Sequence, residues 1–224
     1  MSIKAIIFDV YGTLLTTGTG SVDASREILR RCGHSEIDAT VFYGDWKKLH
    51  KQHMNFCVEN GFLPEREIFA LDLEELYRMY GIVSDARRDV SVMLASLYNR
   101  KMYEDTSASL AYLGSHYRLI IGSNTDTEPM LQNFVYNGLQ FSEIYTSESL
   151  QCYKPDIVFY QRLLEQAGLQ PGEAVFIGDN PIDDVAGPKA AGIRAYHLDR
   201  KGVVKTSEGN KVLHTLPTTL VENW

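Results

Sequence analysis

The sequence predicts an α/β protein in which helices alternate with the strands of a mostly parallel sheet, and an all-helical segment interrupts that sheet. From about residue 102 to residue 198, short apolar runs alternate with stretches of helical periodicity. This alternation favours parallel strands with helices on both faces. Between residues 16 and 101, no run has the character of a strand, and apolar residues recur at helical spacing.

The first element is expected to be a buried strand. A mostly apolar run from Ile3 to Val10 carries an acid, Asp9, near its end and is followed by Gly12. This arrangement is typical of a strand that leads into a tight turn. The next stretch, residues 16–21, is small and polar. We interpret it as a hinge that lets the helical insertion open and close and thereby exclude water during chemistry.

The insertion is expected to consist of four helices. Their approximate limits are 22–32, 38–60, 65–80 and 84–101. Ser21 and Ser84 are candidate N-caps of the first and last helices. Gly33, Gly61 and Gly81 are candidates for ending the first three. Apolar spacing predicts a buried face on the second and third helices; its members are Trp46, Leu49, His53, Phe56, Ile68, Leu71, Leu76 and Met79.

The rest of the chain alternates between the two kinds of element. Helices are expected near 107–116, 128–137, 156–168 and 182–191, and strands at 117–122, 143–146, 174–178 and 194–198. Together with the first strand they predict a doubly wound, Rossmann-like core made of residues 1–15 and 102–224, with residues 16–101 inserted as a helical domain. The last stretch, 200–224, is expected to add a final strand or helix to the core.

Composition narrows the class of protein. The chain has 224 residues, a net charge of −7, 44% hydrophobic residues and 23% charged residues. The negative charge argues against a nucleic-acid-binding protein. Cys32, Cys57 and Cys152 are odd in number and form no CxxC pair, which favours a reducing cytoplasm over a disulfide framework. Neither a membrane-spanning run nor a signal peptide is apparent, so we expect a cytoplasmic protein that binds no membrane.

Polar side chains follow four of the predicted strands. They are Asp9, the pair Ser123 and Asn124, Lys154, and Asp179 with Asp183 and Asp184. Ligands of open parallel sheets bind at the carboxyl ends of the strands. Two carboxylates about 4 Å apart repel by about 4 kcal/mol at an effective dielectric constant of about 20, and a hard divalent cation relieves that repulsion. An all-oxygen site suggests Mg²⁺. Lys154 and the Ser123-Asn124 groups could then hold a substrate anion. An aspartate, a metal, a lysine and a hydroxyl around one point are the groups expected for phosphoryl transfer to the aspartate.

These residues resemble the motifs of the haloacid dehalogenase (HAD) superfamily. Asp9–Leu14 is similar to its first motif, Ser123 to its second, Lys154 to its third and Gly178-Asp179 with Asp184 to its fourth, and the helical insertion resembles a C1-type cap. The resemblance implies that Asp9 is the nucleophile and that Ser123 and Lys154 bind the transferring group. It also implies that Asp9, the backbone carbonyl of Tyr11 and Asp179 hold Mg²⁺, assisted by Asp184 or, as a weaker alternative, by Asp183. Tyr11, Thr13 and Asn124 are expected to line the substrate site, with Thr13 supporting the nucleophile loop.

One position departs from the phosphatase pattern. Phosphatases of this superfamily usually have a second Asp two residues after the nucleophile as the general acid and base, and this chain has Tyr11. A Tyr there is similar to the 2-haloacid dehalogenases, which use no metal. However, those enzymes lack the acidic Gly-Asp motif, and they carry a cap arginine that has no clear counterpart here.

The sequence therefore favours Mg²⁺-dependent hydrolysis of a small, anionic phosphate ester through an aspartyl-phosphate. A 2-haloacid dehalogenase and a low-turnover phosphometabolite-binding protein are the alternatives. A monomer and a homodimer both remain open. His50 and His53, at i and i+3, have a spacing that can bind metal, but no third ligand is evident, and a packed pair is favoured. Phe42, Tyr43 and Trp46 are expected in the core of the helical domain rather than in a substrate pocket.

Overall fold

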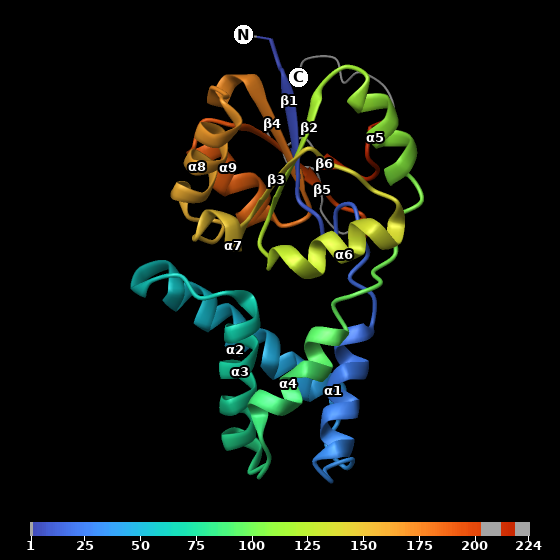
Figure 1. The fold of residues 1–224 in the computed structure, drawn as a ribbon, viewed down its shortest axis with the longest axis vertical. Coiled ribbons are helices and arrows are strands. Elements are labelled where there is room, and N and C mark those ends of the chain that lie inside the picture. Colours follow the sequence, from blue (N-terminus) through green and yellow to red (C-terminus); the bar gives the residue numbers. More distant parts are fainter. Residues whose placement is uncertain (1, 203–211, 218–224) are drawn as a thin grey trace. The chain divides into compact units, whose positions relative to one another are not determined.

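The computed structural model describes residues 2–202 and 212–217 and divides the chain into two compact units (Figure 1). One unit comprises residues 1–16, 101–124 and 137–224, and the other comprises residues 17–100 and 125–136. The first contains the sheet and the second is helical. In the part of the chain that the structure describes, no helix is both long enough and apolar enough to cross a membrane.

The sheet of the first unit is parallel throughout and has the predicted doubly wound topology. Across the described ranges it has six strands in the order β3-β2-β1-β4-β5-β6. Their bounds are Ala5–Phe8 for β1, Arg118–Ser123 for β2, Glu143–Thr146 for β3, Ala174–Gly178 for β4, Arg194–Leu198 for β5 and Val212–Leu213 for β6. Strand β1 is fully buried between β2 and β4. Because all strands run the same way, their carboxyl ends lie along one edge of the sheet.

Helices cover both faces of this sheet. Helices α8 (Ile157–Ala167) and α9 (Gly187–Ala190) lie on one side, and α5 (Thr106–Gly114) lies on the other (Figure 1). Helix α8 has a buried face because Phe159, Leu163 and Ala167 recur at helical spacing and pack in one cluster with apolar residues of the sheet. The chain also forms α7 (Ser147–Leu150), a 3₁₀ turn (Pro171–Glu173) and a π-helical turn (Pro181–Ala186).

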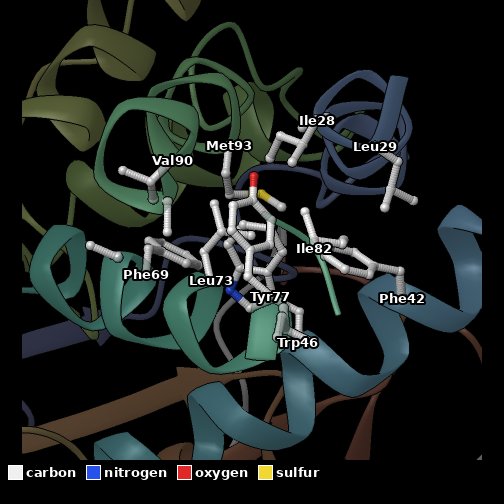
Figure 2. Packing of buried hydrophobic residues seen from close by; sticks show 14 of the residues in the cluster. Ile28, Leu29, Phe42, Trp46, Phe69, Leu73, Tyr77, Ile82, Val90 and Met93 are labelled. Atoms are coloured by element: carbon white, nitrogen blue, oxygen red, sulfur yellow. The ribbon is translucent and has the colours of Figure 1, made fainter. Parts of the chain in front are cut away.

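The second unit is built from α1 (Gly20–Arg31), α2 (Ala39–Asn60), α3 (Glu65–Tyr80), α4 (Ala86–Ala95) and most of α6 (Thr127–Asn137). Figure 2 shows its core, where Trp46, Phe69 and Leu73 lie with Ile28 and Met93 between the helices. Phe42 is also fully buried in this core, and Tyr43 packs against it. Phe42, Tyr43 and Trp46 thus belong to the core of the helical unit, as predicted.

The two candidate histidines of α2 contact a buried carboxylate from α3. The Nδ1 atoms of His50 and His53 lie 2.7 and 2.6 Å from the two carboxylate oxygens of Asp72, and Trp46 Nε1 donates to the same side chain at 3.1 Å. Burial alone would lower the pKa of His50, but Asp72 and Glu65 outweigh it and raise the pKa to about 9. The packed pair is confirmed, because both rings contact the carboxylate of a fully buried acid.

Residues 125–136 were expected in the sheet-containing core and lie instead with the helical unit. Asp126 accepts hydrogen bonds from the amides of Glu65 and Arg66 and so takes the place of an N-cap side chain for α3, whose own N-cap residue is Pro64. Asn133 accepts from the amide of Arg100 at 2.7 Å. We retain the predicted limits, 1–15 with 102–224 for the core and 16–101 for the cap, as a proposal for the functional domains.

Several predicted details are corrected by the structure. The helix expected over 84–101 ends at Ala95, and Asn99 adopts a φ of 58°, which no helix continues through. Ser21 lies inside α1 rather than capping it. Asp85 caps α4, while Ser84 donates to Asp89 at 2.7 Å.

Further corrections concern exposure and the ends of the chain. Phe56 and Met79 are exposed, because the buried faces of α2 and α3 are narrower than the predicted stripe. The helix expected over 182–191 starts with the π-helical turn before becoming α9. The final strand expected after residue 200 is β6, whereas the rest of that prediction, over 203–211 and 218–224, falls outside the described residues.

Candidate active site

Five predicted site residues lie together at the carboxyl edge of the sheet. Asp9 directly follows β1 and its amide donates to the Ile177 carbonyl at 3.0 Å. Ser123 is the last residue of β2, Asp179 follows β4, and Asp184 lies in the π-helical turn after it. Lys154 lies in the loop between α7 and α8. The parallel strands therefore bring together residues that are far apart in the sequence, such as Asp9 and Lys154, which are 145 positions apart.

Lys154 is the centre of this arrangement. Its Nζ donates to Asp9 Oδ1 at 2.9 Å, to Asp184 Oδ1 at 2.6 Å and to the Gly122 carbonyl at 3.1 Å. Ser123 Oγ donates to the same Asp9 oxygen at 2.9 Å. Burial alone would lower the pKa of Lys154, but the carboxylates of Asp184 and Asp9 outweigh it and raise the pKa above its usual value. The lysine is therefore a permanently charged group that holds Asp9 in one orientation.

Three carboxylates converge beside the lysine. Asp9, Asp179 and Asp184 each offer an oxygen, and these oxygens lie within 4.8 Å of one another. Glycines make room for them, since a Cβ at Gly12 would collide with the Asp179 carboxylate and a Cβ at Gly178 would collide with that of Asp184. Oxygen ligands of this kind suit a hard divalent cation such as Mg²⁺, so the residues present fit the metal that the sequence predicts.

Burial and the crowding of like charges raise the pKa values of two of these acids. Burial and the negative charge of Asp9 raise the pKa of Asp179 to about 6. Burial also raises the pKa of Asp184 above its ordinary value, and the Lys154 ammonium opposes that rise. Asp184 is engaged on both oxygens, because the amide of Asn180 donates to Oδ2 at 2.9 Å while Lys154 binds Oδ1. Its main partner is thus the lysine, and Asp179 is the more open ligand.

Replacing Asp179 with Asn is expected to remove a pH dependence of stability. An acid whose pKa is raised on folding stabilises the fold below its unfolded pKa of 3.8, and this contribution is lost as the pH rises through about 6. Between about pH 5 and about pH 7.5, in EDTA, the wild type should lose on the order of 1 kcal/mol of unfolding free energy relative to Asp179→Asn, a figure reduced for partial exposure. Urea denaturation at both pH values measures it.

Asp45→Asn is the matched control for this prediction. The hydrogen bond from Lys48 lowers the pKa of Asp45, so its contribution to stability is constant above 3.8 and is lost only as the pH falls further. The difference between the wild type and Asp45→Asn should therefore be flat over the same pH range. If the difference in unfolding free energy from the wild type changed equally with pH for Asp179→Asn and Asp45→Asn, the pH dependence could not be assigned to Asp179.

The structure gives Asn124 a different role from the one expected. Its side-chain Nδ2 donates to the Lys154 carbonyl at 2.9 Å, and its Oδ1 accepts from the Lys154 amide at 2.8 Å. These two hydrogen bonds to the backbone position the lysine, so we propose that Asn124 acts on the substrate only through Lys154. Thr13 is fully buried, and its Oγ1 has no hydrogen-bond partner among the described residues. Tyr11 is half-buried and follows Asp9 by two residues in the same loop.

Asp183 does not join the three carboxylates. Its Oδ2 accepts from Asn180 Nδ2 at 2.9 Å, and its carbonyl accepts a hydrogen bond from Tyr160 Oη. Of the two acids that the sequence offered for the fourth motif, Asp184 is the one that points at Lys154. Consecutive residues of a helical turn point about 100° apart, so only one of these two acids faces Lys154.

Two supporting residues were missed by sequence reasoning. His197 Nε2 lies 2.9 Å from the Asp179 carbonyl, and Arg200 donates to the Thr13 carbonyl. Both lie at or after the carboxyl end of β5, which is the edge where ligands of such sheets bind. Their position at the end of a predicted strand is the signal that could have identified them, but neither residue belongs to a recognisable motif.

Comparisons with known proteins agree with this geometry. A profile described as "haloacid dehalogenase-like hydrolase" matches residues 3–192. The chain is 26% identical to (S)-2-haloacid dehalogenase 4A of Burkholderia cepacia over 233 residues, covering 100% of this chain and 94% of that protein. It is 25% identical to pyrimidine 5'-nucleotidase PynA of Streptococcus pneumoniae over 211 residues, covering 89% and 87%.

Solved structures share the fold. The HAD-hydrolase YfnB of Bacillus subtilis superimposes with a TM-score of 0.80 at 17% identity, covering 96% of each chain. L-2-haloacid dehalogenases superimpose with TM-scores of 0.74 to 0.77.

Proposed function

Because this chain belongs to the haloacid dehalogenase-like hydrolase family, we propose that it hydrolyses a small phosphate ester with the aid of Mg²⁺. The observation that carries this proposal is the convergence of Asp9, Asp179 and Asp184 at 4.8 Å or less beside a buried lysine. Displacement of halide from carbon has no need of a cation, and such a cluster of acids would only add repulsion to it. Transfer of a phosphoryl group, by contrast, requires the negative charge of the site to be neutralised.

In this reaction Asp9 attacks phosphorus. A carboxylate oxygen forms the bond to phosphorus while the bond to the leaving-group oxygen breaks, which leaves an aspartyl-phosphate. Water then attacks the same phosphorus, inorganic phosphate departs, and the Asp9 carboxylate is restored. Ser123 and Lys154, which contact Asp9 Oδ1 at 2.9 Å each, are placed to bind the oxygens of the transferring group.

The cation would be held by oxygen atoms at the strand ends. We assign Asp9, Asp179 and the backbone carbonyl of Tyr11 as ligands, with Asp184 assisting while it also binds Lys154. Mg²⁺ supplies neutralisation of the charge on the phosphoryl oxygens when bound. Asp179 must be ionised to contribute, and its raised pKa of about 6 leaves it mostly ionised at neutral pH.

Tyr11 restricts the leaving group. An ordinary tyrosine has a pKa of about 10 and is a poor proton donor to a departing alkoxide at neutral pH compared with a carboxylic acid. The substrate should therefore be one whose leaving group departs without full protonation, such as an acyl or aryl phosphate.

Introducing an acid at this position should broaden the substrate range. Tyr11→Asp is expected to raise the kcat/KM for an alkyl phosphate relative to p-nitrophenyl phosphate by about 10-fold or more, because general acid catalysis contributes about 10²–10⁴-fold when the acid is well placed. Tyr11→Phe is the control and should leave this ratio within about twofold of the wild type. The proton-donor argument fails if the two variants have the same ratio.

A 2-haloacid dehalogenase is the second candidate, and Tyr11 together with the haloacid dehalogenase 4A relative supports it. Asp9 would then attack the halogen-bearing carbon, halide would leave, and water would cleave the resulting ester. Lys154 and Ser123 serve this reaction equally well, because both hold the Asp9 carboxylate.

One paired assay separates these functions. A metabolite-wide phosphatase screen is run with Mg²⁺ and with EDTA, beside a halide-release assay on short 2-haloacids. Phosphate release that requires Mg²⁺, without halide release, supports the phosphohydrolase. Halide release that EDTA does not affect overturns it in favour of the dehalogenase. Binding of BeF₃⁻ without turnover on any substrate overturns both in favour of a phosphometabolite-binding protein.

A further inference from the structure

The backbone of the nucleophile loop, residues 9–14, forms several internal hydrogen bonds, including Gly12 N to Leu15 O at 2.7 Å and Leu14 N to Val10 O at 2.8 Å. Gly12 has a φ of +89°, and the Thr13 hydroxyl makes no hydrogen bond among the described residues. Lys154 and Ser123 hold the Asp9 carboxylate, and groups that bind the loop backbone from outside contribute to the positions of Asp9 and of the Tyr11 carbonyl.

Arg200, which follows the carboxyl end of β5, contacts this loop at the same edge of the sheet. Its Nε and Nη2 both donate to the Thr13 carbonyl, at 2.9 and 2.6 Å. Two donors of one planar guanidinium thus converge on a single carbonyl oxygen, a geometry that a lysine ammonium on its flexible stem does not reproduce. The Thr13 carbonyl lies four residues from the carboxylate of Asp9 and two from the carbonyl of Tyr11.

The guanidinium is itself fixed on two further sides. Its Nη1 lies 3.0 Å from Asp105 Oδ2, and its Cζ lies 3.8 Å from the centroid of the Tyr103 ring. Only 11% of the Arg200 side chain is exposed. Asp105 Oδ2 also accepts from the amide of Leu216 at 2.9 Å, so the C-terminal segment contributes to holding the pair.

The segment that supplies Tyr103 and Asp105 also holds the next residue of the loop. The amide of Tyr103 donates to the Leu14 carbonyl at 3.1 Å, and Thr106 Oγ1 donates to the same oxygen at 3.0 Å. Two successive carbonyls of the loop are thus bound from outside. Arg200 binds that of Thr13, and the segment of Tyr103 and Thr106 binds that of Leu14. The Arg200–Asp105 pair links these two contacts. The arrangement spans 187 positions of sequence between Thr13 and Arg200.

We propose that Arg200 is a positioning residue that sets the geometry of the nucleophile loop, and that Asp105 and Tyr103 hold its guanidinium for that purpose. Among the described residues, the hydrogen bonds of Arg200 end on the Thr13 carbonyl and the Asp105 carboxylate rather than on the reacting groups, so Arg200 acts through the loop. Its effect on turnover rests on the proposed function, whereas its effect on the loop does not.

The test compares Arg200→Met with Arg194→Met, an exposed arginine at the start of β5. Arg200→Met keeps the apolar stem and loses every donor. With p-nitrophenyl phosphate and Mg²⁺, we expect kcat to fall by about 10- to 100-fold, because small misplacements of a reacting group have effects of this size. The KM should change by less than about threefold, since Ser123 and Lys154 do not contact Arg200. Arg194→Met should match the wild type.

Hydrogen exchange provides a readout that needs no turnover. In the metal-free protein, the amides of Leu14 and Leu15 should exchange at least about 10-fold faster in Arg200→Met than in Arg194→Met, while amides of β4 keep their wild-type rates. Arg200→Lys, which keeps the charge without the planar fork, should lie between the wild type and Arg200→Met in both kcat and exchange. If Arg200→Met fails to fold, the comparison of Arg200→Lys with the wild type stands in its place.

The outcomes separate the two proposals. Unchanged exchange at Leu14 and Leu15 together with unchanged kcat overturns the positioning role and leaves the phosphohydrolase intact. Faster exchange across all strands of the sheet also overturns it, because Arg200 would then be a general stabiliser of the fold. Faster exchange confined to the loop supports the positioning role even if the wild type releases no phosphate from any substrate.

Discussion

Asp9→Asn is expected to lower kcat/KM for p-nitrophenyl phosphate by about 10⁴-fold or more, which corresponds to about 5 kcal/mol of transition-state stabilisation. An amide oxygen is a far weaker nucleophile than a carboxylate and cannot form the aspartyl-phosphate. Steady-state phosphate release in the presence of Mg²⁺ measures the loss, and EDTA should abolish the wild-type activity in the same assay.

The same substitution should leave the fold intact. Asp9 is one of three converging carboxylates, two of which share a single lysine, so removing its charge relieves repulsion in the metal-free protein. The melting temperature of Asp9→Asn in EDTA is therefore expected to equal or exceed that of the wild type. Asp23→Asn, an exposed acid on α1, is the matched control and should keep full activity. Activity that survives both Asp9→Asn and EDTA would exclude the phosphohydrolase.

Lys154→Met is expected to have the largest effect on stability. The substitution leaves Asp9 and Asp184 buried without their shared cation, and removing one partner of a buried ion pair typically costs about 3–5 kcal/mol. At about 2–4 °C per kcal/mol for a chain of this size, the melting temperature in EDTA should fall by on the order of 10 °C. Turnover should fall by about 100-fold or more, because the group that orients Asp9 is lost.

A double substitution tests whether the unpaired acid causes this loss. Adding Asp184→Asn to Lys154→Met should restore part of the lost stability, since the uncompensated carboxylate is removed with its partner. Lys48→Met is the control. Its ammonium pairs with Asp45 on the surface and is 75% exposed, so the change should be within about 0.5 kcal/mol. If Lys154→Met lowered the unfolding free energy no more than Lys48→Met does, the central role of Lys154 would be contradicted.

Local patterns were sufficient to predict the architecture. The alternation of apolar runs with helical periodicity predicted the doubly wound parallel sheet, and the strands 143–146, 174–178 and 194–198 were predicted with their observed limits. These patterns work because a buried strand and an amphipathic helix each place a distinct period in the sequence. Element ends were less predictable, because α4 ends at Ala95 although apolar residues continue at Leu97.

The sequence by itself determined which residues gather at the site. Asp9, Ser123, Lys154 and Asp179 follow buried strands or their loops, and a parallel sheet must bring its carboxyl ends to one edge. Once the strands are assigned, this rule is sufficient to predict that these side chains lie near one another.

Only the tertiary structure decided how the gathered residues are used. It turns Asp184 rather than Asp183 toward Lys154, and it engages Asn124 with the backbone of Lys154. It also brings Arg200 to the carbonyl of Thr13, 187 positions away. The physical reason is the same in each case. A sequence period reports which face of an element is buried, whereas the partner of a single polar side chain depends on its direction and on residues that no local pattern connects to it.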